Sequence, residues 1–135
     1  MKIKYLTIIT CLFSSVSFAD DLILECVGKT TNNKTKEIQD DFRIYTFKGE
    51  NIPKGGNSLL KGVAYQCKWS EQEIKCDYFI EKNISKDAEN LISKSKIIIH
   101  RISGEVYETR ELGLTSGSIL DYDFQGKCVK SKKLF

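Results

Sequence analysis

Residues 63–80 read VAYQCKWSEQEIKCDYFI, two alternating runs joined by a short polar stretch. Alternation of apolar and polar residues with a period of two is the signal of a β-strand. We predict a hairpin over the connection Ser70–Glu73, in which a single register pairs the two cysteines and keeps all the apolar partners on one face. A cystine fits such a directly opposed, non-hydrogen-bonded pair. The opposed pairs in this register are Cys67 with Cys76, Trp69 with Ile74, Tyr65 with Tyr78 and Val63 with Ile80.

Residues 1–19 have the parts of a secretory signal peptide. Two lysines precede an almost wholly apolar run, residues 5–13, and a small-x-small cleavage site ends at Ala19. Cleavage after Ala19 removes 19 of the 135 residues and leaves 116, which suits a single domain, residues 20–135. The alternatives are an uncleaved anchor, for which the apolar run is short, and lipidation at Cys11, whose flanking residues fit that motif poorly.

Cysteine usage supports export. The chain has five cysteines, and removal of Cys11 with the signal leaves four. An even number in a small exported domain indicates two disulfides. Since the hairpin pairs Cys67 with Cys76, we predict a second disulfide between Cys26 and Cys128. Zinc sites use closely spaced C-x₂₋₄-C pairs, and the closest pair here is separated by eight residues, so we predict no metal.

Most of the remaining chain also alternates with a period of two. The fold predicted from this pattern is all-β: a small antiparallel barrel or sandwich of about seven strands, stapled by two disulfides. We favour the closed barrel, because closure removes exposed strand edges. In residues 42–47 the alternation leaves open which face is buried. The expected strands are residues 20–28, 42–47, 59–69, 74–80, 97–102, 105–111 and 120–128.

The charge of the mature domain is close to neutral. Cleavage takes two of the 21 basic side chains and leaves 19 against 18 acidic ones. Nucleic-acid binding needs clustered positive charge, so we predict no nucleic-acid partner. We interpret the lysines near the C-terminus as a solvated tail. The mature chain also lacks an apolar run long enough for a transmembrane helix.

Candidate catalytic residues are few. His100 is the only histidine, and there is no G-x-S-x-G motif. We expect His100 within a strand, opposite Tyr107 across a two-residue turn at Ser103-Gly104. Asp121 and Asp123 share a strand face but lack a calcium-binding loop pattern, so we interpret them as solvated. The sequence therefore predicts a protein that is not an enzyme and has no cofactor.

The segment Ser103-Gly104-Glu105-Val106-Tyr107 resembles the S-G-x-x-Y signature of the C-type lysozyme inhibitors of bacterial envelopes. Those proteins are small periplasmic or lipid-anchored β-barrels with disulfides, and their signature loop enters the lysozyme cleft. The tryptophan and Lys-Gly segment that follow the signature in that family are absent, since residues 108–118 read ETRELGLTSGS. The resemblance implies an inhibitor acting through the turn from Ser103 to Tyr107. An ordinary Ser-Gly hairpin turn is the alternative.

The leading functional hypothesis is a non-enzymatic, exported β-domain of the bacterial envelope or periplasm, or alternatively a secreted one, that binds another macromolecule. It rests on the missing catalytic motifs, the oxidised cysteines and the near-neutral charge. The second hypothesis is the lysozyme inhibitor. The third is a carrier of a small ligand in the barrel interior, and dense aromatic packing there would count against it. The residues expected to fill that interior are Tyr65, Trp69, Tyr78, Tyr122 and Phe124.

Overall fold

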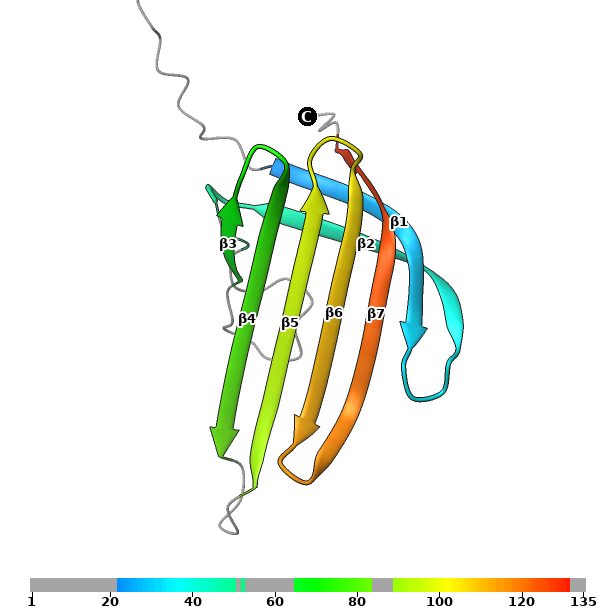
Figure 1. The fold of residues 1–135 in the computed structure, drawn as a ribbon, viewed down its shortest axis with the longest axis vertical. Coiled ribbons are helices and arrows are strands. Elements are labelled where there is room, and N and C mark those ends of the chain that lie inside the picture. Colours follow the sequence, from blue (N-terminus) through cyan, green and yellow to red (C-terminus); the bar gives the residue numbers. More distant parts are fainter. Residues whose placement is uncertain (1–21, 51, 53–64, 84–88, 132–135) are drawn as a thin grey trace, which may run out of the picture.

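The structure, a computed structural model, describes residues 22–50, 52, 65–83 and 89–131. These residues form one antiparallel sheet of seven strands in the order β2-β1-β7-β6-β5-β4-β3 (Figure 1). The all-β fold is therefore confirmed. The strands are β1 (Leu22–Asn32), β2 (Ile38–Phe47), β3 (Gln66–Trp69), β4 (Glu73–Asn83), β5 (Asn90–His100), β6 (Glu105–Leu114) and β7 (Gly117–Lys130).

The predicted export signal, with its cleavage site and Cys11, lies outside the described residues. Within the described ranges, no helix has the length and apolar character needed to cross a membrane.

The hairpin β3–β4 has the predicted register. Its two cysteines form a disulfide with Cα atoms 4.0 Å apart. The rings of Tyr65 and Tyr78 meet edge to face, with centroids 4.7 Å apart. Val63, the outermost predicted partner, lies outside the described residues. The directly opposed pairs include Cys67 with Cys76 and Trp69 with Ile74.

The first and last strands are neighbours, as the second predicted disulfide requires. Cys26 of β1 is directly opposite Cys128 of β7, and the two form a disulfide with Cα atoms 3.9 Å apart. Two residues further along, Gly28 is opposite Gly126. A Cβ atom at Gly28 would lie 2.1 Å from the carbonyl oxygen of Gln125, so this close approach of the strands requires glycine.

The sheet does not close into the barrel that we favoured from the sequence. Its edges are β2 and β3, and Figure 1 shows β2 and the first half of β1 crossing behind the other strands. The rings of Phe47 of β2 and Trp69 of β3 pack with centroids 5.3 Å apart, and among the described residues a bridge joins Ile52 to Tyr65. Because β3 has four residues and β2 crosses it at an angle, side-chain packing rather than a strand ladder brings these edges together.

The core lies on what we call the inner face of the sheet, the side covered by β2. Along β2, Tyr45 and Phe47 point into this core, whereas Phe42 and Ile44 point outward and are more than half exposed. The position of β2 across the other strands decides which of its two faces is buried, a point that the sequence left open. The buried core consists of Cys26, Tyr45, Phe47, Ile52, Ile74, Cys76, Ile97, Ile99, Val106, Phe124 and Cys128.

Candidate functional site

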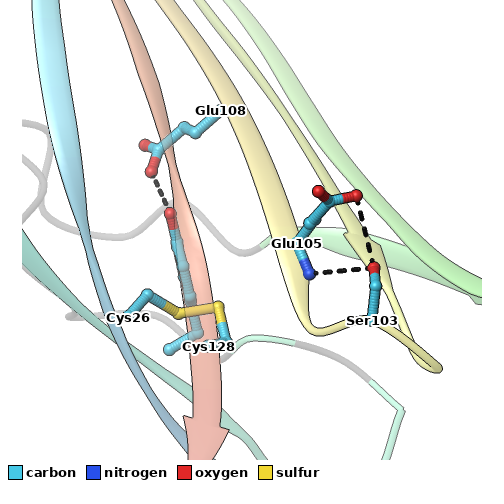
Figure 2. Close-up of a disulfide and its surroundings, with 6 residues drawn as sticks. Cys26, Ser103, Glu105, Glu108 and Cys128 are labelled. Carbon is cyan, nitrogen blue, oxygen red and sulfur yellow. Dashed lines mark hydrogen bonds between the residues drawn. A yellow bond between two sulfur atoms is a disulfide. The ribbon is translucent and has the colours of Figure 1, made fainter.

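The predicted partner-binding turn, Ser103–Tyr107, is packed against β7. The Ser103 hydroxyl lies 3.3 Å from the Glu105 carboxylate and accepts a hydrogen bond from the Glu105 N–H at 3.3 Å (Figure 2). Gly104 has a φ of +76°, and its carbonyl accepts the N–H of Cys128 at 2.8 Å. A Cβ atom at Gly104 would lie 2.6 Å from the Cys128 carbonyl oxygen. The glycine of the S-G-x-x-Y segment is therefore explained by packing beside a disulfide.

The predicted pairing of His100 with Tyr107 is wrong by two residues. Tyr107 is opposite Ile98, and the Gly104 N–H donates to the His100 carbonyl at 2.8 Å. Because its contact with Cys128 holds Gly104 at the start of β6, the turn is centred one residue earlier than the sequence suggests. Tyr107 itself points to the outer face of the sheet and is half exposed.

Asp121 and Asp123, weighed as calcium ligands, lie on the outer face of β7. The Asp121 carboxylate accepts a hydrogen bond from the side-chain amide of Asn33 at 2.7 Å. Across the described ranges, no group of three or more His, Cys, Asp or Glu side chains is arranged to hold a metal ion.

Four apolar side chains gather on the outer face of β2, β1 and β7, and we call them the outer apolar patch. They are Val27, Phe42, Ile44 and Val129, with exposed fractions of 67%, 52%, 57% and 63%. Val27 is directly opposite Phe42, and Glu25 lies between Ile44 and Val129 across the three strands. Exposed apolar side chains gathered on neighbouring strands in this way are typical of interaction sites. The edge position of β2 adds a strand border that a partner could contact.

The inner face carries a buried acid. Glu108 of β6 is 3% exposed (Figure 2); it accepts a hydrogen bond from the Tyr45 hydroxyl and pairs with Nη2 of Arg110 at 3.3 Å. Burial raises the pKa of Tyr45, and the Glu108 charge raises it further, so the phenol stays protonated and donates. Burial lowers the pKa of Arg110, but the Glu108 charge outweighs it and the net direction is upward, so the guanidinium stays charged.

A second ion pair lies beside the first. Nη2 of Arg43 is 3.0 Å from the Asp41 carboxylate and 3.4 Å from the Thr30 hydroxyl, and its guanidinium lies 5.3 Å from the centroid of the Phe124 ring. Burial acts to raise the pKa of Asp41. Hydrogen bonds from Thr30 and from the N–H of Phe42, together with the Arg43 charge, nevertheless hold that pKa below its ordinary value.

The two ion pairs line a hollow of about 300 Å³, whose apolar wall is formed by Leu120, Tyr122 and Phe124 of β7. Nε of Arg43 and Nε of Arg110 are both buried and have no hydrogen-bond partner in the described part of the chain. A buried donor without an acceptor costs about 1–3 kcal/mol. Because both Nε atoms are closed off from solvent, a ligand in the hollow would meet the partly exposed remainder of each arginine side chain.

The interior is filled in one half and hollow in the other. Tyr65 and Trp69 pack against the core, which includes the buried Phe124, whereas Tyr122 lines the hollow and Phe124 forms part of its wall. The hollow at the two arginines lies beyond this packed region and takes the place of the enclosed barrel cavity that the carrier hypothesis assumed.

Glu108 and Arg110 were missed by the sequence analysis. Along β6 both alternating faces carry charged and polar residues, so the pattern does not show which face is buried. Val106 was the signal that could have found them. It lies two residues from Glu108 and so on the same face of the strand, and an apolar residue there indicates that this face is buried.

Comparison of the chain with protein-family models, with curated proteins and with solved structures finds no match. The two disulfides indicate an oxidising, exported compartment. The geometry itself supplies two candidate sites, the outer apolar patch and the hollow on the inner face.

Proposed function

We propose that this chain is a non-enzymatic protein of the bacterial periplasm that binds a partner protein through the outer apolar patch. The observation that carries the proposal is the exposure of four neighbouring apolar side chains on three adjacent strands. Nothing in the core packing requires these side chains to be apolar, since they point away from it. Their apolar character therefore favours a role in recognition.

The surroundings of the patch suit a specific contact. Glu25 lies within it, and Lys127 is directly opposite Val27 on β7. Protein interfaces combine apolar side chains with charged and polar ones; here Lys127 lies at the border of the patch, and a partner would also have to meet the Glu25 carboxylate inside it. Phe42 and Ile44 are 52% and 57% exposed, so covering the rest of each side chain would contribute about 1–1.5 kcal/mol of binding free energy.

The test is capture of partners from a periplasmic extract with the mature, oxidised protein. The double variant Phe42→Thr/Ile44→Thr keeps strand-forming residues at these exposed positions, so its stability should change little. It should lose the captured partner, with affinity reduced more than ~10-fold. Phe79→Thr is the matched control, because Phe79 is 63% exposed on β4, outside the patch.

Two results would contradict this proposal. The first is an identical set of captured proteins with the wild type, the double variant and the control. The second is a concentration-dependent dimer in sedimentation that the double variant abolishes, because the patch would then bind a second copy of the chain.

The lysozyme-inhibitor alternative is supported by the exposure of the β5–β6 turn, where Ile102 is 89% exposed beside Ser103. Under this alternative, the mature protein inhibits a C-type lysozyme in a dose series at micromolar concentration, and Ile102→Asp weakens the inhibition. Because Ile102 makes no buried contact, the variant should fold as the wild type does. Absence of inhibition at micromolar protein rules the alternative out.

A further inference from the structure

The hollow on the inner face has a charged end and an apolar end. Arg43 and Arg110 stand at the charged end, each with one Nη2 engaged by a carboxylate. Leu120 stands at the apolar end, two positions along β7 from Tyr122, which is directly opposite Arg110. The arginine side chains are 28% and 34% exposed, so part of each guanidinium reaches the hollow.

The apolar end continues across the sheet beyond the hollow. Leu120 of β7 is directly opposite Leu112 of β6, which is opposite Ser93 of β5, which is opposite Ile80 of β4. Alternation places these residues on the inner face with Phe124 and Glu108. Leu120, Leu112 and Ile80 are partly exposed. Leu120 and Leu112 therefore extend the apolar wall from β7 onto β6, and the buried Ser93 of β5 separates them from Ile80.

The charges at the arginine end define the kind of head group that fits. Asp41 and Glu108 already balance the two guanidinium charges, so net charge does not draw a polyanion or a metal cation to the cluster, and a head group must be held by directional hydrogen bonds. The guanidinium groups have more N–H donors than these two acids use, and both arginine side chains line the hollow and are partly exposed there. A single carboxylate is the acceptor whose geometry matches a guanidinium.

We infer that the inner face binds a single-chain carboxylate amphiphile, a fatty acid, with its head at Arg43 and Arg110 and its chain along Leu120 and Leu112. The inference is independent of the proposed partner site, because the outer apolar patch lies on the opposite face of the sheet. The Phe42→Thr/Ile44→Thr variant should accordingly bind the fatty acid as the wild type does.

The probes are decanoate and, as a neutral counterpart of the same chain length, decanol, each titrated calorimetrically into the mature, oxidised protein. We expect a Kd for decanoate on the order of tens of micromolar and weaker binding of decanol. Arg43→Gln should weaken decanoate about tenfold and leave decanol unchanged. Leu120→Ser should weaken both probes alike, because it shortens the apolar wall.

Two further variants keep the result interpretable. Arg110→Lys preserves the charge beside Glu108 but removes the planar fork, and it should weaken decanoate selectively. Lys29→Gln is the matched control, because Lys29 pairs with Asp40 in an exposed ion pair; it should bind both probes as the wild type does. The inference is overturned by a wild type that binds neither probe, by decanol binding as tightly as decanoate, or by Arg43→Gln and Arg110→Lys variants that melt like the wild type and bind decanoate equally well.

Discussion

Replacing both Cys26 and Cys128 by alanine is expected to lower the free energy of unfolding by about 4.5 kcal/mol. The disulfide joins residues 102 positions apart and ties the first strand to the last, so its loss releases nearly the whole domain in the unfolded state. A small domain has a total stability of about 5–15 kcal/mol. The double variant should therefore be close to unfolded at body temperature, as urea unfolding followed by circular dichroism would measure.

The matched control is the other disulfide. Cys67 and Cys76 are only nine positions apart, so replacing both by alanine should cost about 2.5 kcal/mol on the same chain-entropy model. The diagnostic quantity is the ranking of the two variants. Equal losses, or a larger loss for the hairpin disulfide, would contradict the view that the long disulfide acts by restricting the unfolded chain.

Glu108→Leu is expected to have the second large effect, a loss of about 3–5 kcal/mol of stability. The substitution leaves the Arg110 charge without its carboxylate and the Tyr45 hydroxyl without its acceptor. Glu108→Gln should lose less, because an amide oxygen can still accept from Tyr45. Thermal unfolding of the oxidised proteins measures both changes.

An exposed ion pair provides the comparison for Glu108. Glu111 pairs with Lys94 at 2.9 Å, with the Glu111 side chain 43% exposed. Glu111→Leu should change stability by less than about 1 kcal/mol, since solvent screens such pairs. If Glu108→Leu unfolded at the wild-type temperature, the buried pair would be energetically neutral and its role would be confined to the hollow.

The hairpin and both disulfides followed from local pattern. The β-strand period of two left one register that aligned Cys67 with Cys76 and kept Trp69 and Ile74 on the same face, and the structure has that register. The second disulfide then followed from elimination, because only Cys26 and Cys128 remained in the mature chain. The hairpin register used residues close in sequence, and the second disulfide used only the number of cysteines in the mature chain.

The turn at Ser103-Gly104 shows where local pattern stops being sufficient. A Ser-Gly pair favours the centre of a two-residue turn, but Gly104 packs against the backbone of Cys128, 24 positions later in the chain. This long-range contact moves the turn centre by one residue and changes the partner of Tyr107. The same limitation applies to Glu108, because Tyr45 reaches it only after β2 has crossed the sheet.

The sequence by itself determined the strand periodicity, the cysteine pairing and the expectation of export, because these depend on neighbouring residues and on composition. Only the tertiary structure decided that the sheet stays open, that Phe42 and Ile44 face outward, and that Arg43, Glu108 and Arg110 meet around one hollow. The physical reason is the path of β2. Packing against strands distant in sequence determines which side chains of β2 are buried. Alternation alone does not distinguish the two faces of this strand.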